Sequence, residues 1–302
     1  MSKIEWTDET WNPFVGCSKI SHACDNCYAE KTAARLANMR ATSYYAGAIT
    51  DGKWNGNICA ATDSGWMRPF RWKNPKRIFV GSMTDVFHPN VPDSLLEKLF
   101  TVVRLNARHT FLLLTKRPER MREFVKKYTR RLGGLALPNV WLGVTAEDQQ
   151  RAEARIPILL DTPAAKRFVS IEPMLGPVNI ESHLLSTYDK AAHDVQMPFG
   201  LSRTDKLDWV IAGGESGPGA RPSHPDWFRS LRDQCAEWGT PFFFKQWGEW
   251  APDCLCGKKS PCPETQRPTP GKMGCMFRCG KKAAGHLLDR QEWRQVPEVQ
   301  NA

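Results

Sequence analysis

The sequence lacks any run of eighteen apolar residues, so no segment is long and apolar enough to span a membrane. Its first residues, MSKIEWTDETW, are polar and acidic, which is not the pattern of an export signal. Ten cysteines in a chain without such a signal favour metal or redox chemistry in a reducing compartment over a disulfide framework. We therefore expect a cytoplasmic protein with no membrane partner.

Acidic residues are also scarce relative to basic ones. The chain has 32 Asp and Glu against 42 Lys and Arg, which gives a net charge of +10. Such a charge favours a polyanionic partner, most often nucleic acid, although it could equally serve solubility. The length of 302 residues, 41% of them hydrophobic, suits one large α/β barrel or two small domains.

A fourth ligand is missing from the stretch WNPFVGCSKISHACDNCYA at residues 11–29. Here Cys17, Cys24 and Cys27 form a C-x6-C-x2-C array. A structural zinc site normally closes with four ligands, and a [4Fe–4S] cluster usually takes four cysteines. A cluster held by three cysteines leaves one iron free to bind a substrate or cofactor. The alternatives are zinc completed by His22 or a distant Cys, or three unrelated buried thiols.

Short apolar runs alternate with helical patterns through most of the chain. The expected strands are 4–7, 77–81, 110–114, 139–144, 167–171, 209–212 and 241–244, and the expected helices are 25–40, 92–106, 119–132, 149–160 and 225–238. Runs that are apolar on both faces and alternate with helices describe a parallel sheet covered by helices. We predict an α/β fold that forms a partial or complete (β/α) barrel. A doubly wound open sheet is the structural alternative.

Polar residues follow five or six successive strands of this pattern. They are Ser82, Thr84, Asp85, Thr115, Lys116, Arg117, Thr145, Glu147, Glu172, Glu215, Ser216, Lys245 and Gln246. In a barrel the chemistry lies at the C-terminal ends of the strands, and the cysteine loop follows the first expected strand. We therefore predict one ring of functional side chains. The alternative for each side chain is a solvated loop or a local salt bridge.

Residues 41–76 form a long irregular segment that we interpret as an insertion or lid. Its basic and aromatic residues are Lys53, Arg68, Arg71, Lys73, Lys76, Tyr44, Tyr45, Trp54, Trp66, Phe70 and Trp72. This mixture suits base stacking beside a phosphate track, and it equally suits a packed lid. We predict a barrel domain at 1–250 that contains this insertion, followed by a C-terminal extension at 251–302.

The C-terminal extension is basic and rich in cysteine. Its cysteines are Cys254, Cys256, Cys262, Cys275 and Cys279, among dense Pro and Gly. A segment without a hydrophobic core of its own needs a stabilising cross-link such as a bound metal. We therefore predict a second metal site here, either zinc or an iron–sulfur cluster. The alternatives are loose thiols or a zinc site with no catalytic role. Residues 254–290 contain eight Lys or Arg and two acidic residues, which favours contact with a polyanion.

A barrel whose first strand leads to three cysteines, ending in C-x2-C and an aromatic residue, resembles the radical S-adenosylmethionine (SAM) superfamily. The common motif there is C-x3-C-x2-C, and this chain has six residues in the first gap. The chain is closer to an uncharacterised phage and prophage family that shows WNP-x2-GC, CYA, TKRP, EPML, GGESG, KQWG and GKKAAG. These motifs occur here at 11–17, 27–29, 115–118, 172–175, 213–217, 245–248 and 280–285. The spore photoproduct lyase branch is similar in outline.

This resemblance implies a radical enzyme. Cys17, Cys24 and Cys27 would hold three irons of a [4Fe–4S] cluster, and the fourth iron would bind SAM. One electron would cleave SAM into methionine and a 5′-deoxyadenosyl radical, which abstracts hydrogen from an unactivated carbon. The implied partners are an electron donor and a nucleic acid or nucleotide substrate. A protein partner is also open.

The resemblance also divides the strand-end residues between cofactor and substrate. Nine would bind SAM: Ser82, Thr84 and Asp85 its ammonium, Lys116 and Arg117 its carboxylate, Thr145 and Glu147 its ribose, and Gly213 and Gly214 its adenine. Glu172, Glu215 and Lys245 are the catalytic candidates on the substrate side.

Two rival interpretations remain. One is a zinc-dependent nucleic-acid-binding protein without catalysis. The other is an iron–sulfur photolyase-like or nuclease protein. Consumption of SAM would separate both from a radical SAM enzyme.

Overall fold

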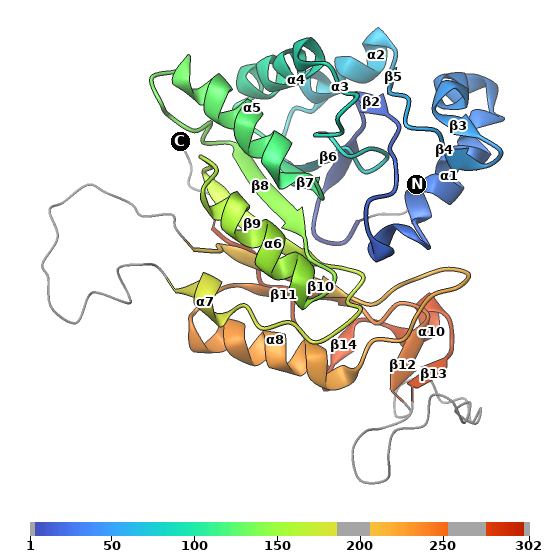
Figure 1. The fold of residues 1–302 in the computed structure, drawn as a ribbon, viewed down its shortest axis with the longest axis vertical. Helices are drawn as coiled ribbons and strands as arrows, with labels where there is room; N and C mark the ends of the chain where they lie inside the picture. The colour runs from blue at the N-terminus through green and yellow to red at the C-terminus, as the bar shows by residue number, and fades with distance from the viewer. Residues whose placement is uncertain (1–3, 186–205, 253–275, 299–302) are drawn as a thin grey trace, which may run out of the picture.

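The computed structural model describes residues 4–185, 206–252 and 276–298. Its centre is a parallel sheet of seven strands in the order β1-β6-β7-β8-β9-β10-β11. Their bounds are β1 Glu9–Trp11, β6 Arg77–Val80, β7 Thr110–Thr115, β8 Val140–Thr145, β9 Lys166–Ile171, β10 Trp209–Gly213 and β11 Phe242–Gln246. The spatial order follows the chain order without reversal, and the sheet curls (Figure 1). The prediction of a partial (β/α) barrel is confirmed, since a doubly wound sheet would reverse its strand order.

Helices follow the strands and cover the outer face of the curled sheet (Figure 1). They are α4 Asp93–Leu105, α5 Pro118–Arg130, α6 Gln149–Leu160, α7 Glu181–Leu184 and α8 Pro225–Glu237. Several begin where the sequence supplies a start signal. The Asp148 carboxylate accepts the Arg151 backbone N–H at 2.9 Å and caps α6, and prolines occupy the first turns of α5 and α8. In the described part of the chain, no helix has the length and apolar character needed to cross a membrane.

The strands bury two separate cores because successive side chains point to opposite faces of a sheet. One core lies between the sheet and the outer helices. The other lies inside the curl and consists of Trp6, Phe79, Leu112, Trp141, Phe168, Trp209, Ile211 and Phe243. Every second residue of a strand points to the same face. From the inward residues Leu112, Trp141, Phe168 and Phe243, this spacing leads to Lys116, Thr145, Glu172 and Lys245. The same alternation that fills the interior therefore carries polar side chains to its C-terminal mouth.

Residues 4–7 do not form the first strand, so that prediction was wrong. The chain turns there, with the Thr7 backbone N–H donating to the Ile4 carbonyl at 3.1 Å. This turn carries Trp6 into the interior, where its ring lies 4.8 Å from that of Phe79. The alternation of Ile4 and Trp6 arises from packing inside the curl, and β1 starts at Glu9.

The insertion packs over the cysteine loop. It contains η2 Arg40–Ala48, β3 Ile49–Thr50, β4 Lys53–Trp54, β5 Cys59–Ala60, α2 Asp63–Trp66 and α3 Arg68–Arg71. Strand β5 pairs with β2 Phe14–Val15, just before Cys17. Gly16 has a φ of +119°, and a Cβ there would lie 1.9 Å from the Asn57 carbonyl oxygen. Tyr45 and Trp66 are buried, so these two aromatic residues belong to a packed lid.

The described end of the chain returns to the barrel. It contains β12 Trp250–Pro252, β13 Met276–Arg278, α10 Lys281–Ala284, β14 Leu287–Leu288 and β15 Gln291–Glu292. The Phe244 N–H donates to the Trp293 carbonyl at 2.8 Å, and the Gln295 N–H donates to the Phe242 carbonyl at 3.1 Å. These bonds pair residues 293–295 with the outer edge of β11. Cys254, Cys256, Cys262 and Cys275 lie outside the described residues, and Cys279 directly follows β13.

Candidate functional site

A cavity of about 430 Å³ lies at the C-terminal ends of the strands. Its wall includes Cys17, Cys24 and Cys27 together with ten of the twelve residues predicted to bind the cofactor or act in catalysis: Ser82, Thr84, Asp85, Lys116, Arg117, Thr145, Glu172, Gly214, Glu215 and Lys245. Glu147 and Gly213 do not line it. The structure thus gathers residues from six strand ends and the cysteine loop around one space. Its volume lies within the range of roughly 300–1,000 Å³ usual for small-molecule sites.

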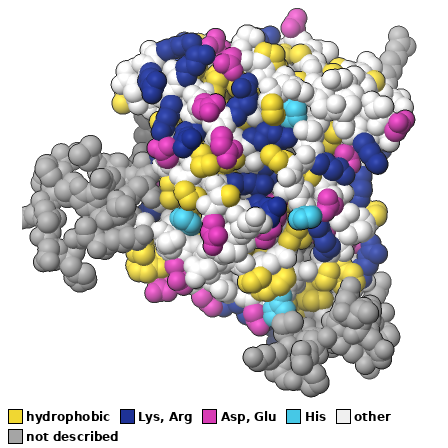
Figure 2. Space-filling model, in the orientation of Figure 1, with side chains coloured by type: hydrophobic (Ala, Val, Ile, Leu, Met, Phe, Trp, Pro, Cys, Tyr) yellow, Lys and Arg dark blue, Asp and Glu magenta, His cyan; other side chains and the backbone are white. Residues whose placement is uncertain are grey.

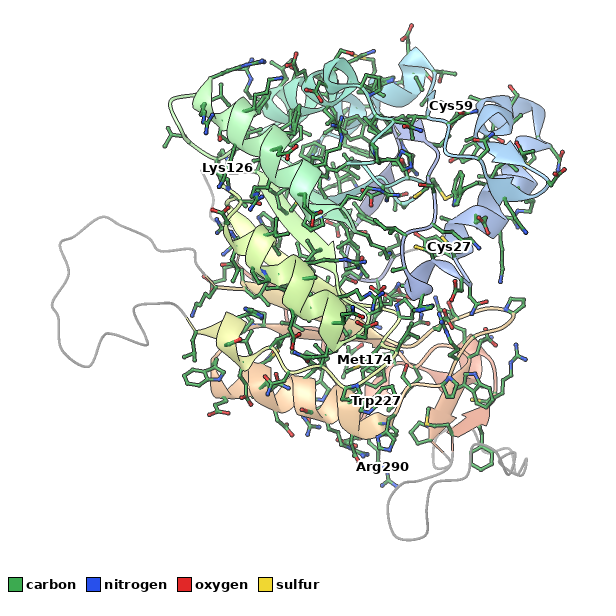
Figure 3. All side chains as sticks on the ribbon, in the orientation of Figure 1. Cys27, Cys59, Lys126, Met174, Trp227 and Arg290 are labelled. Atoms are coloured by element: carbon green, nitrogen blue, oxygen red, sulfur yellow. The ribbon has the colours of Figure 1, made fainter. Side chains whose placement is uncertain are left out.

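Local structure positions each cysteine of the loop. Cys27 directly precedes the first turn of α1 Tyr28–Ala37 (Figure 3). Cys24 ends the short 3-10 helix η1 His22–Cys24. Cys17 follows Gly16, whose carbonyl accepts the Thr84 hydroxyl at 2.6 Å. Cys59 lies in the insertion, well apart from Cys27 (Figure 3).

The donor set of the loop fits a metal cluster. All three thiols are partly buried, and none is in a disulfide. Burial raises the pKa of Cys17 to about 11, with the Asp85 charge adding and the Arg117 charge opposing. Without a metal ion, the Cys17 thiol therefore keeps its proton at neutral pH. In the described parts of the chain, no three or more His, Cys, Asp or Glu side chains are placed to hold a metal ion.

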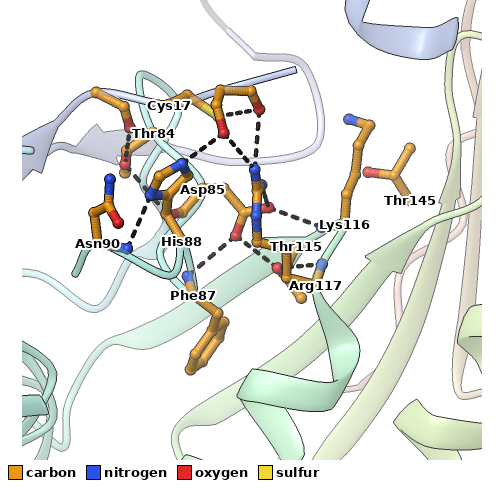
Figure 4. A network of polar contacts seen from close by, with 12 residues as sticks. Cys17, Thr84, Asp85, Phe87, His88, Asn90, Thr115, Lys116, Arg117 and Thr145 are labelled. Carbon is orange, nitrogen blue, oxygen red and sulfur yellow. Dashed lines mark hydrogen bonds and ion pairs between the residues drawn. The ribbon is translucent and has the colours of Figure 1, made fainter. Parts of the chain in front are cut away.

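Asp85 is the centre of a buried polar network (Figure 4). One oxygen accepts the Thr115 hydroxyl at 2.6 Å and the Phe87 N–H at 3.1 Å, and the other accepts the Lys116 N–H at 3.0 Å and Arg117 Nη1 at 2.9 Å. All four lone-pair directions of the carboxylate are thus used by the protein. The structure gives Asp85 the task of orienting Arg117, and predicted contacts of both with SAM stay predictions.

Arg117 connects this network to the cysteine loop. Its Nη2 donates to both the carbonyl and the hydroxyl of Ser18, each at 3.0 Å. The Ser18 hydroxyl also lies 2.7 Å from His88 Nε2, and His88 Nδ1 accepts the Asn90 N–H at 3.1 Å. Burial and the Arg117 charge lower the pKa of His88 to about 4, with Asp85 opposing, so the ring is neutral. Ser18, the residue after Cys17, is therefore in contact with both Arg117 and His88.

Two other predicted cofactor ligands differ in their surroundings. No described residue partners the ammonium of Lys116, which lines the cavity beside Thr145 (Figure 4). Glu147 points away from the cavity and pairs with Arg155 at 2.9 Å. Burial opposes its ionisation, but the Arg155 charge and the Ser21 hydroxyl lower the pKa of Glu147 overall. Lys116 and Thr145 thus line the cavity, Glu147 is paired within the protein, and the predicted contacts of all three with a cofactor stay predictions.

The two catalytic candidates Glu172 and Lys245 face each other across the cavity wall. Lys245 Nζ lies 2.8 Å and 3.1 Å from the two oxygens of the Glu172 carboxylate. Both side chains are partly buried and line the cavity. Glu172 directly follows β9, and Lys245 lies in β11. The pair supplies one donor and one acceptor at the same place.

Glu215 fastens the cysteine loop to β10. It is 5% exposed, and its carboxylate accepts three bonds from Arg221, at 2.6, 2.8 and 2.9 Å, and one from Asn26 at 3.1 Å. Arg221 Nη2 also donates to the His22 carbonyl at 2.9 Å. Burial opposes ionisation, but the bonds from Arg221 and Asn26 lower the pKa of Glu215 overall. We call these contacts of Glu215 with Arg221 and Asn26 the clamp. The catalytic role predicted for Glu215 stays a prediction.

Close backbone packing explains the two glycines after β10. A Cβ at Gly214 would lie 1.9 Å from the Trp247 carbonyl oxygen, and a Cβ at Gly213 would lie 3.2 Å from the Glu172 carboxyl carbon. Protein atoms therefore occupy the space that a side chain at either position would need. Their predicted approach to an adenine ring stays a prediction.

The cavity wall also includes Glu5 and Trp6, to which the sequence assigned no role, and Gln246, which it placed in the ring without a specific function. Trp6 and Gln246 are 2% and 4% exposed, and Trp6 Nε1, Gln246 Oε1 and Glu5 Oε2 have no hydrogen-bond partner among the described residues. Lys281 from α10 also lines the cavity, with its Nζ 3.7 Å from Glu5. Gln246 follows an expected strand, and this position already indicated that it would lie near the site. Glu5 and Trp6 reach the cavity through a turn, for which the sequence offered no signal.

The chain belongs to the family described as "Protein of unknown function (DUF5131)", which matches residues 1–297. That description names neither a phage origin nor a reaction. No curated protein matches the chain.

Two solved structures are similar to it, both mutants of spore photoproduct lyase. A cysteine-to-serine mutant has 10% identity and a TM-score of 0.42, over 91% of this chain and 70% of the other. A cysteine-to-alanine mutant with dinucleoside spore photoproduct has 12% identity and a TM-score of 0.38, over 87% and 65%. A likeness of this size leaves the function to be argued from the site itself.

Proposed function

We propose that this chain is a radical SAM enzyme. Cys17, Cys24 and Cys27 would hold a [4Fe–4S] cluster, SAM would bind beside it, and the substrate would be a nucleic acid or nucleotide. The observation that carries the proposal is the placement of three thiols on the wall of one cavity, together with the polar strand ends of a partial barrel.

The donor set supports a cluster with one open iron. In a [4Fe–4S] cluster each thiolate binds a different iron, so the ligands surround a space and do not converge on one point. Three cysteines leave one iron for SAM. When bound, cluster and cofactor supply radical chemistry: one electron from an external donor breaks the carbon–sulfur bond, giving methionine and a 5′-deoxyadenosyl radical that takes a hydrogen atom from the substrate.

The protein's own residues would bind and orient the cofactor. The Lys116 ammonium has no partner among the described residues, and a cofactor carboxylate would supply one. The Thr145 hydroxyl lines the same wall and is placed for a ribose hydroxyl. Tyr28 follows Cys27, and its hydroxyl donates to the Ser82 carbonyl at 3.0 Å. Tyr28 thus contributes an aromatic side chain to the cavity wall.

The substrate side of the cavity suits a nucleobase. A base presents donors and acceptors along one planar edge, which matches the unpartnered atoms of Trp6, Gln246 and Glu5. Trp54 and Tyr28 add aromatic surfaces on the wall. The ion pair of Glu172 and Lys245 could exchange one of its partners for a polar group of the substrate. The net charge of +10 favours a phosphate-bearing substrate over a neutral one.

Anaerobic reconstitution with iron and sulfide tests the cluster. Wild-type protein and Cys59→Ala should gain the same amount of iron, at least about four atoms per chain, since Cys59 lies outside the cavity wall. Cys27→Ala should gain clearly less and should lose cleavage of SAM. Tight zinc in the wild-type protein with no cluster would favour the zinc-dependent nucleic-acid-binding protein instead.

Incubation of the loaded protein with SAM, a reductant and DNA or RNA tests the substrate. Mass spectrometry of the digested nucleosides should show a nucleoside of altered mass that is absent from the Cys27→Ala reaction. Cleavage of SAM without any altered nucleoside would leave the radical chemistry in place and remove nucleic acid as the substrate.

Further parts of the proposal concern the rest of the chain. We place a second metal site, zinc or iron–sulfur, at Cys254, Cys256, Cys262, Cys275 and Cys279, in a separate C-terminal extension of a cytoplasmic protein from a phage or prophage family. Protein in which Cys17, Cys24 and Cys27 are all Ala should then retain bound metal. Metal-free protein after anaerobic purification would contradict the second site.

A further inference from the structure

We infer that the hydroxyl of Ser18 is a hydrogen-bond donor directed into the cavity beside Cys17, where it raises the reduction potential of the bound cluster. The inference rests on the proposed function, because the acceptor would be a sulfur of the cluster or of its Cys17 ligand. The direction of the proton itself follows from contacts on the protein side alone.

His88 fixes the first of these contacts. The backbone N–H of Asn90 lies 3.1 Å from His88 Nδ1, and a backbone N–H can only donate (Figure 4). Nδ1 is therefore an acceptor without a proton, and a ring with a bare Nδ1 carries its proton on Nε2. His88 Nε2 lies 2.7 Å from the Ser18 hydroxyl oxygen. His88 is thus the donor in this contact, and Ser18 accepts.

Arg117 fixes the second contact. Its Nη2 lies 3.0 Å from the Ser18 hydroxyl oxygen, and a guanidinium can only donate. The guanidinium cannot turn away easily, because Nη1 is bound to Asp85 at 2.9 Å and Nη2 also donates to the Ser18 carbonyl. The contact between Arg117 and the Ser18 hydroxyl is therefore held by the same buried network that joins β6 and β7 (Figure 4).

A serine hydroxyl has two lone pairs and one proton. The two lone pairs of Ser18 accept from His88 and Arg117, so its proton cannot point toward either residue. No described residue accepts this proton. Ser18 and Cys17 both line the cavity, so the remaining direction for the proton is into that space.

A donor in this direction would change the chemistry of the cluster. Hydrogen bonds to the sulfurs of an iron–sulfur cluster stabilise its more negative, reduced form and so raise its reduction potential. The Arg117 charge is offset by its ion pair with Asp85 at 2.9 Å, which leaves the Ser18 proton as the directional contribution of the network. Ser18 is then a tuning residue. His88, Arg117 and Asp85 position its proton.

The test is the midpoint potential of the loaded protein, measured anaerobically without SAM. Ser18→Ala removes the donor and should shift the potential to a more negative value, while Ser18→Thr keeps a hydroxyl and should restore it. Ser82→Ala is the matched control, because Ser82 also lines the cavity but donates to Asn12 Oδ1 at 3.2 Å. Its proton is already used inside the protein, so the Ser82→Ala potential should equal that of the wild type.

The inference is overturned if Ser18→Ala has the wild-type potential, or if Ser82→Ala shifts as far as Ser18→Ala. Should Ser18→Ala fail to hold the cluster, His88→Phe decides. Without the His88 N–H the Ser18 hydroxyl can rotate, so the potential should again become more negative, and an unchanged value overturns the inference. A wild-type protein that binds no cluster contradicts the proposed function itself, which is a distinguishable result.

Discussion

At the scale of single residues, the cavity wall contains buried polar atoms that have no hydrogen-bond partner in the described part of the chain. Buried polar groups in proteins are nearly always hydrogen-bonded, so each exception needs a reason. Trp6 Nε1, Gln246 Oε1 and Glu5 Oε2 are three such atoms, and all belong to residues on this wall. Recognition of a substrate edge would supply the missing partners.

The first prediction concerns Trp6. Trp6→Phe keeps an aromatic ring in the interior and removes only the indole N–H as a donor. A lost hydrogen bond contributes about 0.5–1.5 kcal/mol, so nucleotide affinity should fall about two- to tenfold in an equilibrium titration. Trp238→Phe is the control, because Trp238 Nε1 also lacks a partner but lies outside the cavity wall. Equal loss of affinity in both variants would contradict a contact between Trp6 and the substrate.

The second prediction concerns pH and His88, which is 2% exposed. Burial and the charges of Arg117 and Arg120 lower its pKa from 6.5 to about 4, against the opposing charge of Asp85. Between these values the unfolded chain takes up a proton that the folded protein excludes, so stability falls as the pH drops. The loss approaches about 3 kcal/mol at pH 4.

His88→Gln should therefore lose less stability than the wild type between pH 7 and pH 4, as measured by denaturant unfolding of the metal-free protein. His286→Gln removes an exposed histidine and should follow the wild-type pH dependence. A His88→Gln curve parallel to the wild-type curve would rule out the excluded proton.

At the scale of elements, the cysteine loop is held at several points by segments far away in the sequence. Thr84 after β6 binds Gly16, Arg117 after β7 binds Ser18, and Arg221 after β10 binds the His22 carbonyl. Each contact comes from a strand end, so the sheet positions the loop as one unit. A loop fixed before metal arrives lowers the conformational cost of binding a cluster.

The third prediction tests this support. Arg221→Ala leaves the buried Glu215 carboxylate without its guanidinium partner. Because Arg221 itself is 34% exposed, we expect the free energy of unfolding to fall by about 1–3 kcal/mol, less than for a fully buried pair. Iron content after reconstitution should fall as well, because the loop loses a contact.

Arg229→Ala is the matched control for Arg221→Ala. Arg229 pairs with Asp289 at 2.7 Å in the C-terminal hairpin, and both side chains are more than a third exposed. Its removal should cost at most about 1 kcal/mol and leave the iron content unchanged. If both variants retain full iron, the clamp does not support the site.

The strand ends show how far the sequence leads at this scale. Lys116, Thr145, Glu172 and Lys245 continue inward rows that the apolar alternation already defines, so their convergence followed from periodicity and the parallel sheet. The cysteine loop lines the same cavity, but it follows β1 and not the expected strand at 4–7.

Long-range pairing could not be foreseen in this way. Asp85 and Arg117 are 32 positions apart, and Ser18 and His88 are 70 apart. Nothing in the local pattern indicates that Asp85 would use all four acceptor directions inside the protein. The turn that carries Trp6 inward likewise depends on tertiary packing, which outweighed the strand-like alternation of residues 4–7.

At the scale of the whole molecule, the face shown in Figure 2 carries side chains of both charges. Lys and Arg are interspersed with acidic side chains over the face in Figure 2. Several basic residues of α5 are neutralised, since Lys126 pairs with Asp161 at 2.8 Å and Lys127 with Asp93 at 3.3 Å. Of the lysines predicted to contact a polyanion, Lys281 lines the cavity and Lys282 is exposed beside it. Lys258 and Lys259 lie outside the described residues.

The fourth prediction compares the lysines predicted to contact a polyanion with the paired lysines of α5. Replacing Lys258, Lys259 and Lys282 with Ala should weaken binding to single-stranded nucleic acid and reduce the salt slope by at most about three, because each lost phosphate contact releases one fewer counterion. Replacing Lys126 and Lys127 is the control and should change the slope less. Lys281 is left unchanged because it belongs to the cavity wall. Titration at two salt concentrations decides, and an unchanged slope would remove these lysines from the interface.

The most direct test of the central claim is electron paramagnetic resonance of the reduced, anaerobically loaded protein with and without SAM. A cluster held by Cys17, Cys24 and Cys27 has one iron open to the cofactor, so adding SAM should change the spectrum, and methionine and 5′-deoxyadenosine should then form. A fully loaded, reduced sample whose spectrum is the same with and without SAM would contradict the account.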